Sequence, residues 1–270
     1  EPVARVAPQE GNPMIDRYTR PEMGHVFSLQ NKYAIWQKIE VLACDAHAEL
    51  GEIGITREEA SWIREHASFD KDEIDKIEAV TNHDVIAFLT NMGSYVDADV
   101  PKDGPKPSRW IHYGMTSSDL GDTALCYQLS QATNILIEDC RVLGRICRRR
   151  ALEEKDTLCV GRTHGIHAEP MTFGMKFGSW AWELKRDLDR LVDARKGISC
   201  GAISGAVGSY SSIDPRVERY VCERLGLAVD PLSTQVISRD HHAFLAGVLA
   251  TVASTCERIA TEVRSLQKTD

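Results

Sequence analysis

Residues 245–266, LAGVLATVASTCERIATEVRSL, carry the most regular pattern in the sequence. Apolar side chains recur there in alternating steps of four and three residues, a spacing that puts them on one face of a helix. This stripe consists of Leu245, Leu249, Val252, Cys256, Ile259, Val263 and Leu266. It is typical of a long helix in a bundle. No glycine or proline follows Gly247, so we expect the helix to run to the end of the chain.

Helical periodicity also dominates the rest of the chain, and no region shows convincing strand alternation. Residues 99–109 hold three prolines and a glycine and predict a loop. Residues 197–212 are rich in glycine and serine and predict an irregular segment. The expected helices are 28–54 with Ser28 as N-cap, a short helix from Thr56, one capped by Asp84, 122–154, 171–196, and 215–225 with Pro215 in its first turn.

The predicted fold class is therefore all-α. We expect a leader at residues 1–13, a small N-terminal helical domain at residues 14–121, and a partial helical bundle at residues 122–270. Long helices with apolar stripes have to bury them. The bundle predicted here is incomplete, which suggests that further chain, partner subunits or both complete it.

Composition limits the function classes. The chain of 270 residues has a formal net charge of -8, which argues against a nucleic-acid partner. Its eight cysteines are scattered and form no C-x-x-C pair. Scattered free thiols of this kind fit a protein of a reducing compartment. We see no signal peptide and no apolar run near the ~20 residues that span a bilayer. We therefore expect a cytoplasmic protein without membrane segments.

Two polar clusters precede the predicted bundle. Arg17 and Tyr18 lie in RYTRPEM, residues 17–23, and could hold a phosphate through a guanidinium fork and a hydroxyl. An exposed surface segment is the alternative. Asn82, His83 and Asp84 stand at a helix start, where the histidine could donate to an anion or merely neighbour the helix cap.

A third cluster, residues 112–119 (HYGMTSSD), lies just ahead of a long predicted helix. Hydroxyls and backbone N–H groups at a helix N-terminus suit a carboxylate or phosphate, and the helix dipole favours the negative charge. Thr116 and Ser117 are the candidate ligands, and His112 lies beside them. An ordinary N-cap sequence is the alternative.

The fourth cluster, residues 161–170 (GRTHGIHAEP), is the densest in functional groups. His164 and His167 are suited to proton transfer near neutral pH. Their spacing could also suggest a metal, but no third ligand stands at a recognised distance and H-E-x-x-H is absent, so we expect no metal. The chain contains no P-loop, no Rossmann turn and no Gly-x-Ser-x-Gly elbow.

These four clusters, in this order, resemble the motifs of the adenylosuccinate lyases of the fumarase/aspartase superfamily. The matching strings are RYTRPEM, NHDVIAF, HYGMTSSD, GRTHGIHAEPMTFG and STQVISRD, and the resemblance covers residues 14–270. It implies a helical homotetramer with a central bundle and active sites where subunits meet. It also implies β-elimination of fumarate from adenylosuccinate to give AMP, and a parallel cleavage of the succinyl-carboxamide ribotide, with no cofactor or metal.

The resemblance also implies residue roles. His164 would be the general acid and His112 would assist it. Thr116 and Ser117 would hold a succinyl carboxylate. The further substrate contacts implied are Arg17, Tyr18, Asn82, His83, Asp84, Thr163, Gln235 and, more weakly, Arg239.

The sequence departs from the family pattern in two ways. The loop SSxMPxKxNP, which supplies the family's general-base serine, lies downstream of the last helix and is absent from these 270 residues. We therefore expect this chain alone to be inactive. Ser238 stands where related enzymes often carry glutamine. Another lyase of the superfamily acting on argininosuccinate or a cycloisomerase substrate, or an inactive helical scaffold, are the alternative interpretations.

Overall fold

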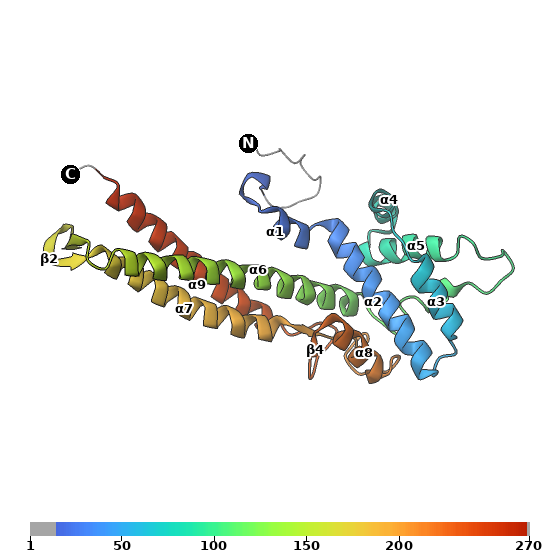
Figure 1. Ribbon diagram of the computed structural model, residues 1–270. Helices are drawn as coiled ribbons and strands as arrows, with labels where there is room; N and C mark the ends of the chain where they lie inside the picture. The colour runs from blue at the N-terminus through green and yellow to red at the C-terminus, as the bar shows by residue number, and fades with distance from the viewer. Residues whose placement is uncertain (1–14, 269–270) are drawn as a thin grey trace. The chain divides into compact units, whose positions relative to one another are not determined.

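The computed structural model describes residues 15–268 and consists mainly of helices (Figure 1), which confirms the predicted all-α class. The predicted leader, residues 1–13, lies outside the described residues. The helices are η1 (Asp16–Tyr18), α1 (Pro21–Val26), α2 (Leu29–Leu50), α3 (Arg57–His66), α4 (Lys71–Thr81), α5 (Asp84–Val96), η2 (Pro107–Trp110), α6 (Ser117–Glu153), α7 (Phe173–Ile198), α8 (Pro215–Leu225) and α9 (Arg239–Leu266). The strands are β1 (Leu158–Thr163), β2 (Ile166–Thr172), β3 (Cys200–Gly201) and β4 (Ala228–Val229).

Local capping chemistry explains several helix ends. The hydroxyl of Ser28 accepts the N–H of Asn31 and starts α2, which ends at the left-handed Gly51. Thr56 and Glu59 form the reciprocal capping box that their spacing predicted. The boundaries predicted for residues 215–225 are those of α8.

Several predicted boundaries were wrong. Helix α2 ends at Leu50 rather than near Gly54, because Gly51 adopts a left-handed φ of 69°. Helix α7 spans Phe173–Ile198 rather than residues 171–196.

Helix α6 begins at Ser117 rather than Asp122, because the Asp119 carboxylate accepts the N–H of Thr116 at 2.9 Å and closes the first turn early. The cap of α5 is His83 rather than Asp84. Helix α9 ends at Leu266 rather than at the chain terminus.

The absence of strands was also predicted wrongly. Strands β1 and β2 pair antiparallel as a hairpin around His164 and Gly165, which both have positive φ angles, 54° and 75°. Two successive left-handed residues match the twist of a tight hairpin. His-Gly is a weaker signal for such a turn than Asn-Gly or Asp-Gly. Both strands are largely exposed, so the alternation of buried and exposed side chains that identifies a strand is weak.

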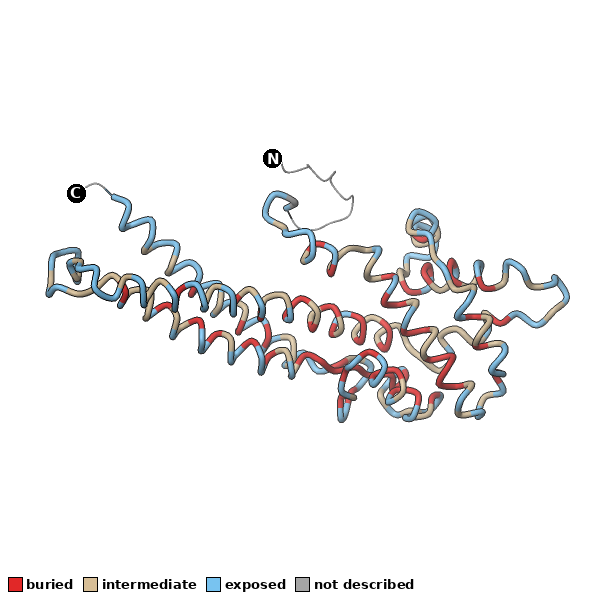
Figure 2. Tube along the Cα trace, in the orientation of Figure 1, coloured by how far each residue is buried: buried red, intermediate tan, exposed pale blue. Residues whose placement is uncertain are grey.

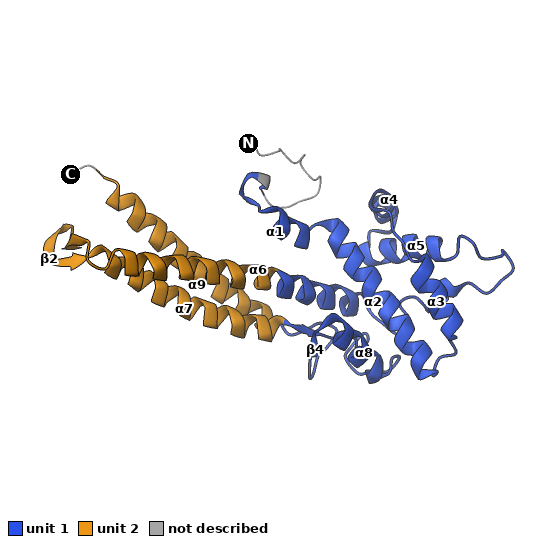
Figure 3. Cartoon of the chain, in the orientation of Figure 1, with its two compact units in different colours: residues 1–131, 199–238 blue, residues 132–198, 239–270 orange. Residues whose placement is uncertain are grey.

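The chain forms two compact units, coloured separately in Figure 3. Unit 1 comprises Glu1–Gln131 with Ser199–Ser238, and unit 2 comprises Ala132–Ile198 with Arg239–Asp270. Each unit is made of two separate stretches of sequence, whereas the two domains expected on either side of residue 121 are continuous. That domain division stays a prediction.

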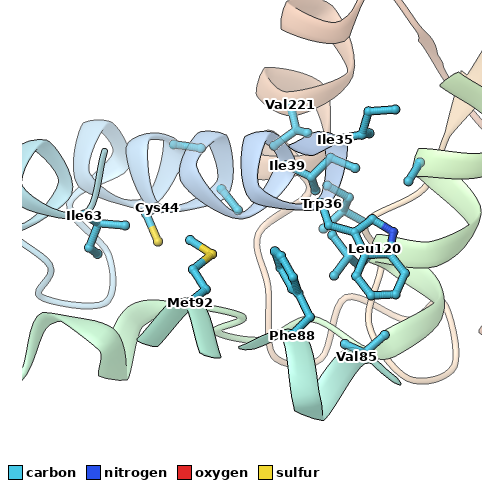
Figure 4. Close-up of a cluster of buried hydrophobic side chains, with 14 of the residues drawn as sticks. Ile35, Trp36, Ile39, Cys44, Ile63, Val85, Phe88, Met92, Leu120 and Val221 are labelled. Atoms are coloured by element: carbon cyan, nitrogen blue, oxygen red, sulfur yellow. The ribbon is translucent and has the colours of Figure 1, made fainter. Parts of the chain in front are cut away.

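The core of unit 1 is built around α2. Figure 4 shows Trp36 of α2 close to Phe88 of α5 and Met92 of α5 next to Cys44 of α2, and Figure 2 shows that much of α2 is buried. The rings of Tyr33 and Phe88 stack with centroids 5.7 Å apart. Aromatic pairs of this kind contribute about 0.5–1.5 kcal/mol beyond their buried area. This packing fixes the start of α5 relative to α2.

Unit 2 pairs α7 with α9. Glu183 of α7 accepts hydrogen bonds from Thr255 and Arg258 of α9, and Lys176 contacts Glu262 at 2.6 Å. Leu245 and Val248 are buried, whereas Cys256, Val263 and Leu266 of the predicted apolar stripe are exposed.

Helix α9 is also the one helix among the described residues that is long and apolar enough to cross a membrane, and 17% of its most apolar window is buried. A single such helix is weak support for a membrane span, since core helices of soluble bundles have the same length and composition.

The loop before α6 is closely packed at Gly114. It has a φ of +73°, and a Cβ there would lie 2.2 Å from the carbonyl oxygen of Ser212. Gly51, with a φ of +69°, has nothing within 4 Å of the same position. We expect Gly51→Ala to lower the free energy of unfolding by about 1 kcal/mol, the cost of a left-handed alanine. We expect Gly114→Ala to lower it by clearly more, about 2–4 kcal/mol, because a backbone clash is added.

Urea denaturation of both variants checks this comparison. Equal losses for Gly114→Ala and Gly51→Ala would show that the loop yields to the added methyl group.

Candidate functional site

Two helix N-termini meet in unit 1. His83 caps α5, and its Nδ1 accepts the N–H of Ile86 at 3.3 Å. Ser117, the first residue of α6, has its Oγ 3.4 Å from Nε2 of His83. Because Nδ1 accepts, the proton of the neutral ring sits on Nε2. The junction therefore combines an imidazole N–H, a hydroxyl and the positive ends of two helix dipoles, an arrangement that suits an anion.

A lysine and an aspartate border this junction. Asp84 begins α5, and its Oδ2 lies 3.2 Å from Nζ of Lys32 on α2. The same ammonium lies over the ring of Trp36, 4.2 Å from its centroid. Sequence reasoning missed Lys32, because one lysine on a helix carries no motif.

His112 is held by a buried carboxylate. Its backbone N–H donates to Oε2 of Glu40 at 2.8 Å, and its Nδ1 lies 2.6 Å from Oε1. Glu40 is 0% exposed, and His112 has a left-handed φ of 62°. Burial alone would lower the pKa of His112, but the hydrogen bond and charge of Glu40, with the more distant charge of Asp119, raise it above its ordinary value. The imidazole therefore stays protonated to a higher pH than a free histidine.

Asp119 joins this loop to the glycine-rich segment. Its carboxylate accepts the N–H groups of Thr116, Ser204 and Gly205 at 2.9, 3.0 and 3.1 Å. Burial raises the pKa of Asp119, while the three N–H donors act in the opposite direction. Thr116 and Ser117 are partly buried and precede Asp119 in the sequence by three and two residues.

Other predicted site residues of unit 1 lie apart from these contacts. Asn82 has a φ of 52°, ends α4 and is exposed beside His83. Arg17 and Tyr18 lie on η1, where the guanidinium donates to the tyrosine hydroxyl and both side chains are exposed. Gln235 is exposed in the segment before α9.

The remaining predicted site residues belong to unit 2. His164 is exposed in the turn of the β1–β2 hairpin, and Thr163 pairs with Ile166 at the end of β1. Arg239 begins α9. A common site for these residues and those of unit 1 stays a prediction. Among residues 15–268, no three histidine, cysteine or acidic side chains are placed to hold a metal ion.

Glu40 is the functional candidate that sequence reasoning missed most clearly. Its signal was present, because it lies on the side of α2 that carries Tyr33, Trp36 and Ala43. A charged residue on an apolar helix face needs a buried partner. The sequence does not show that the partner is His112, 72 positions away.

Comparison with known proteins decides the family. A family model described as Lyase matches residues 17–270. The chain belongs to this lyase family. It is 46% identical over 257 residues to the adenylosuccinate lyase of Bacillus subtilis and 46% identical over 258 residues to that of Synechocystis sp.. Each alignment covers 95% of this chain and 57% of the relative, so the lyase chain described here spans little more than half the length of these curated relatives.

Solved structures agree on the fold of this lyase. A 3-carboxy-cis,cis-muconate lactonizing enzyme from Pseudomonas putida superposes with a TM-score of 0.84 at 26% identity, over 93% of this chain and 57% of that one. A fumarate lyase from Mesorhizobium sp. BNC1 superposes with a TM-score of 0.83 at 23% identity, over 92% and 57%. The helical architecture is thus that of the fumarase/aspartase superfamily.

The pKa of His112 predicts a pH-dependent stability. A histidine whose pKa is raised on folding stabilises the fold below its ordinary pKa of 6.5, and this contribution is lost as pH rises through the folded value. His112→Asn keeps a residue that tolerates the left-handed conformation but removes the charge. We expect it to lower the free energy of unfolding most near pH ~6 and less near pH ~9.

His47→Asn provides the contrast, since burial lowers the pKa of His47 and reverses the sign. Its effect on the free energy of unfolding should shrink as pH falls. A loss in His112→Asn that stays constant or grows with pH, measured by urea denaturation, would contradict the ion pair.

Proposed function

We propose that the protein acts as an adenylosuccinate lyase, eliminating fumarate from adenylosuccinate to leave AMP, and from the succinyl-carboxamide ribotide (SAICAR) to leave AICAR. The junction of α5 and α6 carries this proposal, since His83, Ser117 and two helix N-termini form an anion site in unit 1. Relatives named adenylosuccinate lyase at 46% identity support the choice of substrate.

The elimination requires charge stabilisation at one carboxylate of the succinyl group. When a base removes the proton from the neighbouring carbon, negative charge develops on that carboxylate as an aci-carboxylate. Thr116 and Ser117 hold it with their hydroxyls at the N-terminus of α6, where the Asp119 carboxylate holds the first turn of the helix in place before the substrate binds. Protonated His112 adds a positive charge from the same loop.

The leaving amino nitrogen of the adenine requires a proton, and His164 supplies it as general acid. The exposed position of His164 at the hairpin turn leaves its ring accessible to a substrate held by another part of the assembly. Thr163 contacts the substrate beside it, and Gln235 and Arg239 supply further polar contacts.

The nucleotide end of the substrate needs a phosphate site and a base site. Arg17 and Tyr18 hold the phosphate, since a guanidinium and a hydroxyl on η1 are exposed side by side. Asn82, His83 and Asp84 line the nucleotide site at the start of α5.

The general-base serine belongs to a loop outside these 270 residues, in keeping with the 57% of each relative that the chain covers. The active protein is a cytoplasmic homotetramer whose subunits share active sites, and the exposed apolar side chains Val263 and Leu266 of α9 suit helix packing in such an assembly. No cofactor or metal takes part in the proposed reaction.

Ultraviolet absorbance of adenylosuccinate tests the reaction. The full-length protein that contains this chain should convert adenylosuccinate faster than argininosuccinate or a muconate substrate. The 270-residue chain alone should show little or no turnover, because it lacks the base. Preference for another substrate by the full-length protein, or clear turnover by the 270-residue chain, would reject the respective part of the proposal.

His164→Gln tests the general acid. In the full-length protein we expect it to lower kcat by a factor of about a hundred or more, with substrate affinity nearly unchanged, because a proton donor is removed while the binding groups remain. His167→Gln is the matched control, since His167 is exposed on the same hairpin and has no assigned role. Equal kcat values for wild type and His164→Gln would remove His164 from the mechanism.

A further inference from the structure

We propose that Glu40 is a positioning residue that fixes the orientation of the His112 ring for the elimination, with Nδ1 toward Glu40 and Nε2 free for the substrate. This inference rests on the proposed function, because it assigns Glu40 a task in that reaction. Both oxygens of the Glu40 carboxylate contact the same residue, His112.

Glu40 lies in the middle of α2 and is 0% exposed, among the side chains that form the core of unit 1. A buried carboxylate without a partner is strongly destabilising, and a fully apolar residue would pack there without that penalty. The partner that compensates the charge is the backbone N–H and ring of His112.

His112 adopts a φ of 62°, a conformation that a residue with a Cβ rarely takes. The bond from its N–H to Oε2 of Glu40 holds this turn in place. Two further contacts tie the loop to its surroundings: Cys44 on α2 contacts the carbonyl oxygen of Trp110 at 3.6 Å, and Asp119 accepts the N–H of Thr116.

With Nδ1–H donating to Oε1 of Glu40, Nε2 is the nitrogen left for the substrate. The charged groups acting on the ring are Glu40 from α2 and Asp119 from α6, and both favour its protonated form. Nε2–H is then a donor of fixed direction, which is what stabilisation of a developing carboxylate charge requires.

A matched control exists in the same unit. Glu218 of α8 is 2% exposed, and its two oxygens accept the N–H of Ile203 and the hydroxyl of Tyr210, each at 2.8 Å. Like Glu40, it is a buried carboxylate that accepts two hydrogen bonds, but it does not contact His112. Substituting each with glutamine therefore separates a loss of general stability from a loss of His112 positioning.

The experiment compares Glu40→Gln, Glu40→Asp and Glu218→Gln in the full-length protein. Nitrogen NMR of labelled histidine, assigned with His112→Asn, reports the tautomer and titration of His112, and kinetics with adenylosuccinate report kcat and KM across pH. We expect Glu40→Gln to lower the titration midpoint of His112, to shift the pH profile in the same direction, and to reduce kcat about ten- to a hundredfold with a smaller change in KM.

We expect Glu40→Asp to recover part of both effects, because it restores the charge at a slightly different distance. Glu218→Gln should lower the melting temperature yet leave the titration of His112 unchanged.

An unchanged tautomer and midpoint in Glu40→Gln would overturn the proposal, as would a kcat loss matched by Glu218→Gln with the same pH profile. If Glu40→Gln does not fold, the same readings on Glu40→Asp decide. A wild-type protein that titrates as expected but does not convert adenylosuccinate would reject the proposed function while retaining the Glu40–His112 pair.

Discussion

The carboxylate of Asp119 connects the two irregular segments of unit 1 that carry the candidate site. It accepts three backbone N–H groups, one from the turn before α6 and two from residues 204–205. These N–H groups lie outside helices and sheets, so the Asp119 carboxylate supplies the acceptors that a helix or sheet would otherwise provide. Glu40 and Glu218 act in the same way on His112 and Ile203. Buried acids thus provide acceptors where the backbone departs from helix, and Asp119 in this way fixes the start of α6.

The fixed start of α6 has a chemical consequence at its junction with α5. A helix N-terminus attracts an anion only if its N–H groups and hydroxyls keep their direction when the anion arrives. Packing of Phe88 against Trp36 and Tyr33 holds α5, while Asp119 holds the first turn of α6. Both helix starts are therefore held in place, and the Ser117 hydroxyl and the His83 ring stay close to each other before an anion binds.

Elements with local signals could be predicted from the sequence, and elements set by distant contacts could not. Ser28, the Thr56–Glu59 box and Pro215 gave correct helix starts, because capping depends on residues three or four positions apart. The cap of α5 was misassigned since a histidine rarely takes this role. The hairpin at His164 was missed because its exposed strands lack alternation. The clusters around His83, His112 and Thr116 could be proposed as site candidates from their residue types and their place before helices, but Glu40 required the tertiary contact that pairs it with His112.

We propose that the junction of α5 and α6 binds a carboxylate of the substrate or product. A crystal structure of the full-length protein with fumarate bound would show whether it does. We expect a fumarate carboxylate within hydrogen-bond distance of Ser117, with the His83 ring beside it. Fumarate bound elsewhere, with the junction occupied only by solvent, would contradict it.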